Sequence, residues 1–251
     1  MNTILSTLFL SLLLSSNLIA QSEFITEETT VASFKMGSMQ SSVYNYFSEN
    51  SYHSRMDFSF KGKGIARLMS RDVDNGTAIS FEDSTIVKIN YNKNRFTKQS
   101  FSEFLAEKNS SENSENESEN SNEQSDSDED DSDPIVSDTT EMINGFESYK
   151  IILNDDIENK QFIWVTAKEE QSVLVKTMKE KIAQFENSWG SFDINFSELG
   201  MNENAILVKA IFTDQDGSFE YNLKKYSSTN GMPEMFNMPK EYKKVKKLKM
   251  F

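Results

Sequence analysis

The segment from Thr139 to Thr166 constrains the fold most, because it has the pattern of a β-hairpin. Residues 149–153 (YKIIL) and 162–166 (FIWVT) are rich in the β-branched and aromatic side chains that favour strands. Between them, residues 154–159 (NDDIEN) form a polar cluster of turn-forming residues. This segment therefore predicts two paired strands that anchor an antiparallel sheet.

The same alternation of apolar and polar side chains recurs on both sides of this hairpin. In residues 54–98, Met56, Phe58 and Phe60 alternate with polar residues, and several short strands with turns between them follow. Asn75-Gly76 is predicted to be one of these turns. Residues 206–223 form a second hairpin around the turn sequence DQDG. The chain is thus expected to be α+β and mostly β, with a curved antiparallel sheet.

Two helices are expected to pack on this sheet. Ser100 and Glu103 have the spacing of a capping box, which predicts a short helix from Ser100 to about Lys108. A longer helix is expected from Gln171 to Asn187, and an edge strand after it at residues 192–196. The apolar stripe of the longer helix recurs at steps of three and four residues, at Leu174, Met178, Ile182, Phe185 and Trp189.

The N-terminal residues have the pattern of a secretory signal peptide. Residues 1–20 contain a short apolar run and end in a small residue, so cleavage is expected before Gln21. The run is too short and too interrupted for a transmembrane helix, and the mature protein is expected to be secreted or periplasmic. Residues 21–53 are expected to be partly disordered, with a short helix near Val43–Phe47.

The negative charge of the chain is concentrated in one tract. The net charge is −14, and residues 107–141 hold 14 acidic residues and one basic residue. Residues 107–138 are predicted to be a disordered acidic insertion, because they lack the apolar side chains that would offset the entropy cost of ordering. The insertion would interrupt a single β domain, residues 54–106 and 139–244, which a lysine-rich tail (residues 245–251) follows. The sequence lacks the basic face that would indicate nucleic-acid binding.

The acidic tract is also the candidate cation site. Its carboxylates could bind calcium, and the candidate ligands are Asp126, Asp128, Asp130 and Asp131. The tract lacks the glycine and the final glutamate of an EF-hand loop, so a solvated spacer or diffuse cation binding is the alternative.

The residues that commonly carry catalysis are scarce. The chain has no cysteine and one histidine, His53, which excludes thiolate chemistry and cysteine-ligated zinc. It has no G-x-S-x-G nucleophile elbow and no phosphate-binding loop. A hydrolytic carboxylate pair stays open, since 40 acidic residues offer many pairs. The sequence therefore favours a non-catalytic protein with no cofactor.

The order of these segments resembles the lipoprotein-carrier-like group of LolA, LolB and LppX-type proteins and a related set of secreted Gram-negative envelope proteins. The resemblance rests on the signal peptide, the strands of residues 56–98, the NGFESYKIIL…FIWVT hairpin and the ending MFNMPKEYKK. It implies a half-barrel sheet wrapped on helices, with an apolar concavity that holds acyl chains. The acidic insertion departs from the family pattern.

The leading hypothesis is accordingly a secreted or periplasmic protein that binds an apolar, lipid-like ligand between the concave face of the sheet and the helix of residues 171–187. The alternative is a structural or interaction protein whose acidic loop engages a basic partner or calcium. The residues expected to line the ligand site are Phe58, Phe60, Phe162, Trp164, Phe219 and Tyr221.

Overall fold

The computed structural model describes residues 23–115, 134–156, 159–168, 171–185, 196–197, 199, 201–202 and 204–248. The expected signal peptide and the expected strand at residues 192–195 lie outside this part of the chain. The strands are β1 (Glu23–Phe34), β2 (Gly37–Ser48), β3 (Ser51–Gly62), β4 (Arg71–Ser80), β5 (Thr85–Asn90), β6 (Arg95–Ser100), β7 (Ile135–Ile143), β8 (Phe146–Asp155), β9 (Lys160–Thr166), β10 (Leu207–Thr213), β11 (Gly217–Ser228) and β12 (Lys243–Lys244). The helices are α2 (Phe101–Glu115) and α3 (Val173–Ile182), and the short 3₁₀ helices are η1 (Gly64–Met69) and η2 (Glu234–Phe236).

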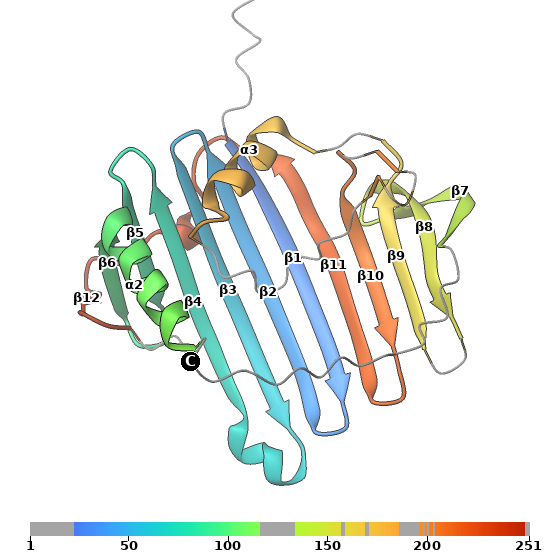
Figure 1. Ribbon diagram of the computed structural model, residues 1–251, viewed down its shortest axis with the longest axis horizontal. Coiled ribbons are helices and arrows are strands. Elements are labelled where there is room, and N and C mark those ends of the chain that lie inside the picture. The colour runs from blue at the N-terminus through green and yellow to red at the C-terminus, as the bar shows by residue number, and fades with distance from the viewer. Residues whose placement is uncertain are drawn as a thin grey trace, which may run out of the picture.

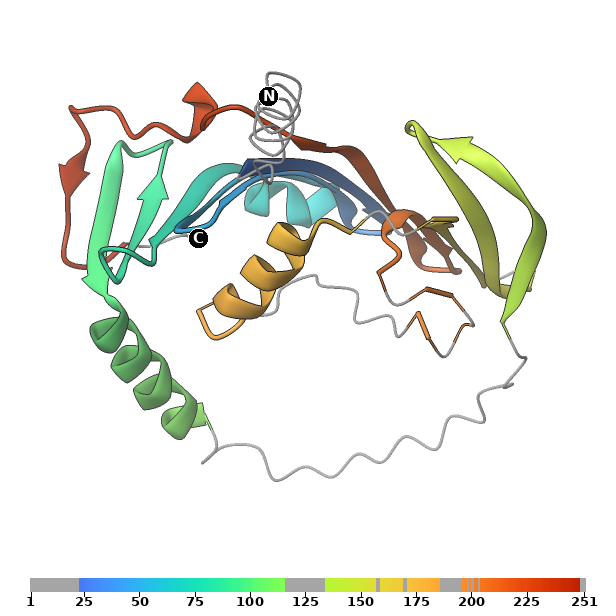
Figure 2. The same ribbon diagram turned by 90° about the horizontal axis from the view of Figure 1, so that it is seen from above.

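All of these strands form one open, curved sheet (Figures 1 and 2). Their order is β12-β6-β5-β4-β3-β2-β1-β11-β10-β9-β8-β7, and every neighbouring pair is antiparallel except β12 with β6. Figure 2 shows α3 inside the curve and α2 at one side of it, so the helices lie on the concave side. The expected mostly β half-barrel that packs on one or two helices is confirmed.

The N-terminal segment differs from the expectation, because residues 23–48 form the two central strands β1 and β2. The helix expected near Val43–Phe47 was wrong. Phe47 pairs with Phe24 on one side and with Tyr52 on the other, and this pairing between neighbouring strands determines the local conformation. Polar side chains hide the strand pattern, since β1 reads EFITEETTVASF.

A second difference concerns Asn75-Gly76, which is not a turn. Both residues lie within β4, where Gly76 pairs with Arg55 of β3. A Cβ atom at Gly76 would lie 2.9 Å from Cε2 of Tyr91. The glycine therefore serves close packing of a tyrosine ring against the strand.

The capping box is confirmed at the start of α2. The backbone N–H of Ser100 donates to Glu103 Oε2 at 2.8 Å, and the N–H of Glu103 donates to Ser100 Oγ at 3.3 Å. The helix reaches Glu115 and β7 begins at Ile135, so both elements extend into the predicted insertion of residues 107–138. Residues 116–133, which hold most of the acidic side chains of the insertion, lie outside the described residues.

Two hydrophobic clusters pack on the concave face. The first lies under α3 and α2, where Phe47, Ile79 and Ile86 meet Met178 and Ile182 of α3. The second lies over β8, β9 and β10, where Ile151, Ile163, Val165 and Ala210 are covered by Ala205 and its neighbours in the chain. Of the stripe predicted for the helix at residues 171–187, Leu174, Met178, Ile182 and Phe185 pack in or against the first cluster, although α3 ends at Ile182. Trp189 lies outside the described residues.

The C-terminal segment, residues 229–248, crosses the convex face (Figure 2). Arg55 of β3 holds it there, since its guanidinium donates to both carboxylate oxygens of Asp74 at 2.9 and 2.6 Å and to the carbonyl of Met235 at 2.9 Å. The same guanidinium lies 4.1 Å from the ring centroid of Tyr91. The segment then reaches the sheet edge, where β12 pairs with β6.

Beneath this segment, His53 lies between the rings of Tyr46 and Phe236, with centroids 5.8 and 6.1 Å away. Burial lowers the pKa of His53 to about 4. Between the ordinary pKa of 6.5 and this value, the unfolded chain binds a proton that the folded chain does not. The free energy of unfolding should therefore fall by on the order of 2 kcal/mol as the pH drops through this window.

Urea unfolding at several pH values from 7 to 4 measures this dependence, and His53→Phe is the control variant. Phenylalanine keeps the ring contacts and cannot titrate, so the difference between the two pH profiles isolates the histidine from the many carboxylates. Parallel profiles would show that His53 is protonated as easily in the folded protein as in the unfolded chain.

Candidate ligand-binding face

The side chains that point into the concavity follow from the strand registers. Phe24, Phe47, Tyr52 and Ile79 are paired across β1 to β4, and all of them pack in the cluster under α3. Every second residue from these positions therefore faces the concave side, down to the far ends of the strands. At these far ends, away from α3, several described apolar side chains on the concave side belong to neither core cluster. We call the phenylalanine and methionine side chains of this set the apolar strip, and its members are Phe34, Met39, Met56, Phe58, Phe60 and Phe219.

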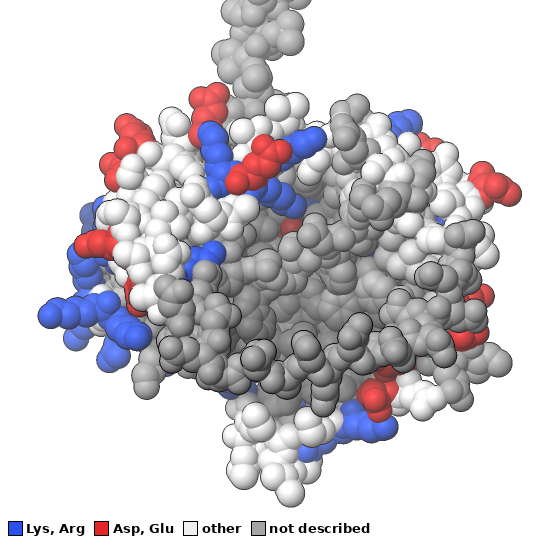
Figure 3. Space-filling view, in the orientation of Figure 1, with Lys and Arg blue, Asp and Glu red and all other residues white. Residues whose placement is uncertain are grey.

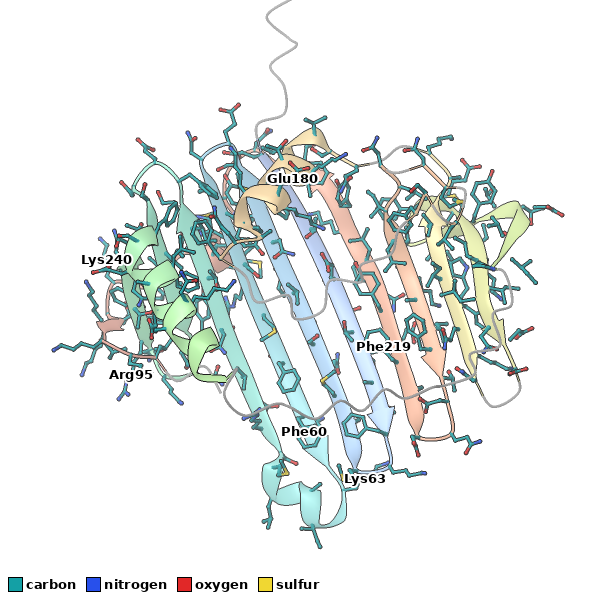
Figure 4. The ribbon with its side chains drawn as sticks, in the orientation of Figure 1. Phe60, Lys63, Arg95, Glu180, Phe219 and Lys240 are labelled. Atoms are coloured by element: carbon teal, nitrogen blue, oxygen red, sulfur yellow. The ribbon has the colours of Figure 1, made fainter. Side chains whose placement is uncertain are left out.

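The apolar strip is built from strands that the sheet brings together. Ala32 of β1 pairs with Met39 on one side and Phe219 on the other, and Met39 in turn pairs with Phe60. The rings of Phe34 and Phe60 are stacked with their centroids 6.0 Å apart. Val73 of β4 pairs with Phe58 and extends the strip. Figure 4 shows Phe60 and Phe219 on this side of the sheet.

A chain of polar side chains separates the apolar strip from the cluster under α3. Tyr52 donates its hydroxyl to Asn45 Oδ1 at 3.0 Å, and the Asn45 amide donates to Thr26 Oγ1 at 3.0 Å. Thr26 then donates to Glu28 Oε1 at 3.4 Å. Tyr221 of β11 hydrogen-bonds the same carboxylate; burial, followed by the Glu28 charge, raises the pKa of Tyr221 above its ordinary value. The polar chain thus crosses β3, β2, β1 and β11.

The structure brings together four of the six predicted lining residues. Phe58, Phe60 and Phe219 belong to the apolar strip, and Tyr221 ends the polar chain beside it. Phe162 and Trp164 lie on the convex face instead, because their neighbours Ile163 and Val165 pack in the second concave cluster.

The surroundings of these two side chains agree with that placement. The Nζ atom of Lys150 lies 3.9 Å from the ring centroid of Phe162, and Nζ of Lys209 lies 5.2 Å from that of Trp164. The indole N–H of Trp164 donates to Glu141. Phe162 and Trp164 therefore cannot line a site in the concavity.

Phe34 and Met39 were not among the predicted lining residues, because they come from the segment expected to be partly disordered. The signal was present in residues 37–47, where Met39, Val43 and Phe47 all occupy odd positions. Ser and Asn residues stand among the apolar ones in this stretch, so the alternation was hidden.

The candidate cation ligands Asp126, Asp128, Asp130 and Asp131 all lie outside the described residues. Within the described ranges, no group of three or more His, Asp or Glu side chains is arranged to hold a metal ion. No helix in these ranges is long and apolar enough to cross a membrane.

Comparison with known proteins finds matches among solved structures. No protein-family model and no curated protein sequence matches the chain. Among solved structures, an uncharacterized conserved protein from Thermus thermophilus is 8% identical, with 90% of this chain and 91% of that chain covered and a TM-score of 0.33. LprF from Mycobacterium bovis is 9% identical, with 85% and 90% covered and a TM-score of 0.31.

A putative outer membrane lipoprotein-sorting protein domain from Vibrio parahaemolyticus is 11% identical, with 88% and 91% covered and a TM-score of 0.22.

Proposed function

We propose that the protein is a non-catalytic carrier that binds an apolar, acyl-chain-like ligand along the apolar strip. The observation that supports this proposal is the strip itself, a row of phenylalanine and methionine side chains on the concave face of the sheet. The row lies between two packed clusters and belongs to neither. Aromatic and thioether side chains suit a flexible alkyl chain, because they offer a large and adaptable apolar surface.

The polar chain gives the proposed site two different ends. An acyl chain along the strip would reach Glu28 and Tyr221, where the polar chain ends and Tyr221 packs against the second cluster. Side chains there offer hydrogen-bonding groups to a polar head group, as expected for a site with an apolar body and a few polar groups. The expected signal peptide would place this carrier outside the cell or in a periplasm, which belongs to the same proposal.

Chain length is the sharpest test of this proposal. If the strip shields methylene groups from water, each one contributes about 0.8 kcal/mol to binding. A ligand that is about four methylene groups shorter should therefore bind weaker by about 3 kcal/mol, on the order of a hundredfold. The measurement is displacement of a fluorescent fatty acid from the purified chain, and native mass spectrometry of the same preparation identifies any lipid that co-purifies.

A series of alcohols with the same chain lengths controls for the head group. The length dependence should persist in that series, because the apolar strip contacts only the chain. Affinity that depends on the head group and not on the chain length would refute the carrier proposal.

A further inference from the structure

The turn between β3 and β4 exposes apolar side chains that contribute nothing to either core. Ile65 and Leu68 of η1 are each 91% exposed and Met69 is 69% exposed. No residue of η1 is buried. Folding of this chain alone therefore does not explain why these positions are aliphatic.

The neighbouring turn adds a fourth such side chain. Met36, between β1 and β2, is 66% exposed, and its carbonyl accepts a 2.8 Å hydrogen bond from the backbone N–H of Lys63. The two turns thus form one protrusion, which we call the apolar tip (Met36, Ile65, Leu68 and Met69). It holds four of the ten exposed large apolar side chains found among the described residues.

The apolar tip is a compact structure. A Cβ atom at Gly62 would lie 1.9 Å from the carbonyl oxygen of Ala66, so η1 packs directly against the end of β3. The backbone N–H of Gly62 also donates to Ser70 Oγ at 2.9 Å. The exposed side chains are therefore presented from a closely packed turn.

The charge around the tip is opposite to that of the whole chain. Residues 61–71 (KGKGIARLMSR) contain four basic residues and no acidic one, in a chain of net charge −14. All four of these side chains are exposed, and together they form a basic collar (Lys61, Lys63, Arg67 and Arg71). Figure 3 shows the tip as an uncharged protrusion, with Lys and Arg side chains beside it and Asp or Glu side chains next to those.

From this combination we infer that the apolar tip docks the protein on a lipid bilayer that carries anionic head groups. Aliphatic side chains at a protruding turn can enter the acyl region of a bilayer, and cations behind them then lie at the level of the head groups. A soluble polyanion would bind the collar but offers no apolar surface to Ile65 and Leu68. A protein partner would be expected to meet an apolar patch with a rim of mixed charge, whereas residues 61–71 around Ile65 and Leu68 carry four positive charges and no negative one. The nearby Asp216 is paired with Lys35 of the neighbouring turn.

The position of the tip has a consequence that rests on the proposed function. Phe60 of the apolar strip lies two residues before Gly62, at the same end of β3 (Figure 4). Docking would therefore bring one end of the strip to the bilayer surface, where acyl chains are found.

The experiment measures partition of the chain from Gln21 onward, which holds every described element, onto vesicles by co-sedimentation. Vesicles of phosphatidylcholine alone are compared with vesicles that also contain phosphatidylglycerol. The double variant Ile65→Ser/Leu68→Ser should lower partition to the anionic vesicles by about tenfold or more. Lys63→Ser/Arg67→Ser should lower it by a similar factor, and added salt should abolish that difference.

Val173→Ser is the matched control, because Val173 is an aliphatic residue of α3 that is 80% exposed and far from the tip in sequence and structure. It should leave partition unchanged. A tryptophan at the tip, Leu68→Trp, should show a blue-shifted emission with anionic vesicles.

Two results would overturn docking: equal partition of the tip variants and the parent chain, or an unshifted Leu68→Trp emission. The proposed carrier function is tested independently of docking, because fatty-acid displacement is measured without vesicles and does not involve the tip. Tip variants that keep vesicle-free ligand binding and lose partition support both proposals, and partition without ligand binding supports docking alone.

Discussion

Replacing Phe58 and Phe60 with glutamate should weaken the binding of a long acyl chain by about a hundredfold or more while the chain still folds. Both side chains are half-buried and face the concave side, where neither packs into a core cluster. Binding would have to remove water from two carboxylates that no ligand group could pair, at a cost of several kcal/mol. Displacement of a fluorescent fatty acid measures the affinity, and circular dichroism during thermal unfolding monitors the fold.

Phe162→Glu is the control that separates the two faces of the sheet. Phe162 is a phenylalanine of similar burial in β9, and the sequence alone placed it in the same lining. It lies on the convex face, where a glutamate could pair with Lys150, so the affinity should change by less than about threefold. If Phe162→Glu abolishes binding and the concave double variant does not, the ligand binds to the convex face.

The comparison of Phe58 and Phe60 with Phe162 shows what the two-residue alternation of side chains along a strand can and cannot predict. It placed Phe162 and Trp164 together, because neighbours at i and i+2 always share a face. It could not say which face, since that depends on where the covering segments lie. Ala205 and its neighbours cover Ile163 and Val165, and this contact joins residues about forty positions apart. Local signals such as the capping box of Ser100 and Glu103 were read correctly, because both partners lie within one turn of helix.

The same reasoning explains the error in the N-terminal segment. β1 and β2 have few apolar residues and many Thr and Ser residues, so burial does not mark them as strands. Their conformation comes from pairing on both sides, with β2 between β1 and β3 and β1 between β2 and β11. Pairing of β1 with β11 joins residues near opposite ends of the chain, and no local pattern reports it.

Phe47→Ala tests this central position and should lower the free energy of unfolding by about 3–5 kcal/mol. Phe47 is 1% exposed, its ring centroid lies 5.3 Å from that of Tyr52, and it packs in the cluster that includes Met178 of α3. The substitution leaves a cavity that the paired strands cannot close, because their backbones are held on both sides. Urea unfolding followed by circular dichroism measures the change.

Val31→Ala in β1 is the control, since Val31 is 43% exposed and should change stability by less than about 0.5 kcal/mol. If residues 21–53 were a loosely attached segment, Phe47→Ala would be as mild as this control. The structure predicts a further effect, because β1 joins the two halves of the sheet. On one side of β1 lie β2, β3, β4, β5 and β6, and on the other lie β11, β10, β9, β8 and β7. Loss of packing at Phe47 should therefore destabilise the distant half as well, and the fluorescence of Trp164 in a Trp189→Phe background should report the same lowered midpoint as circular dichroism.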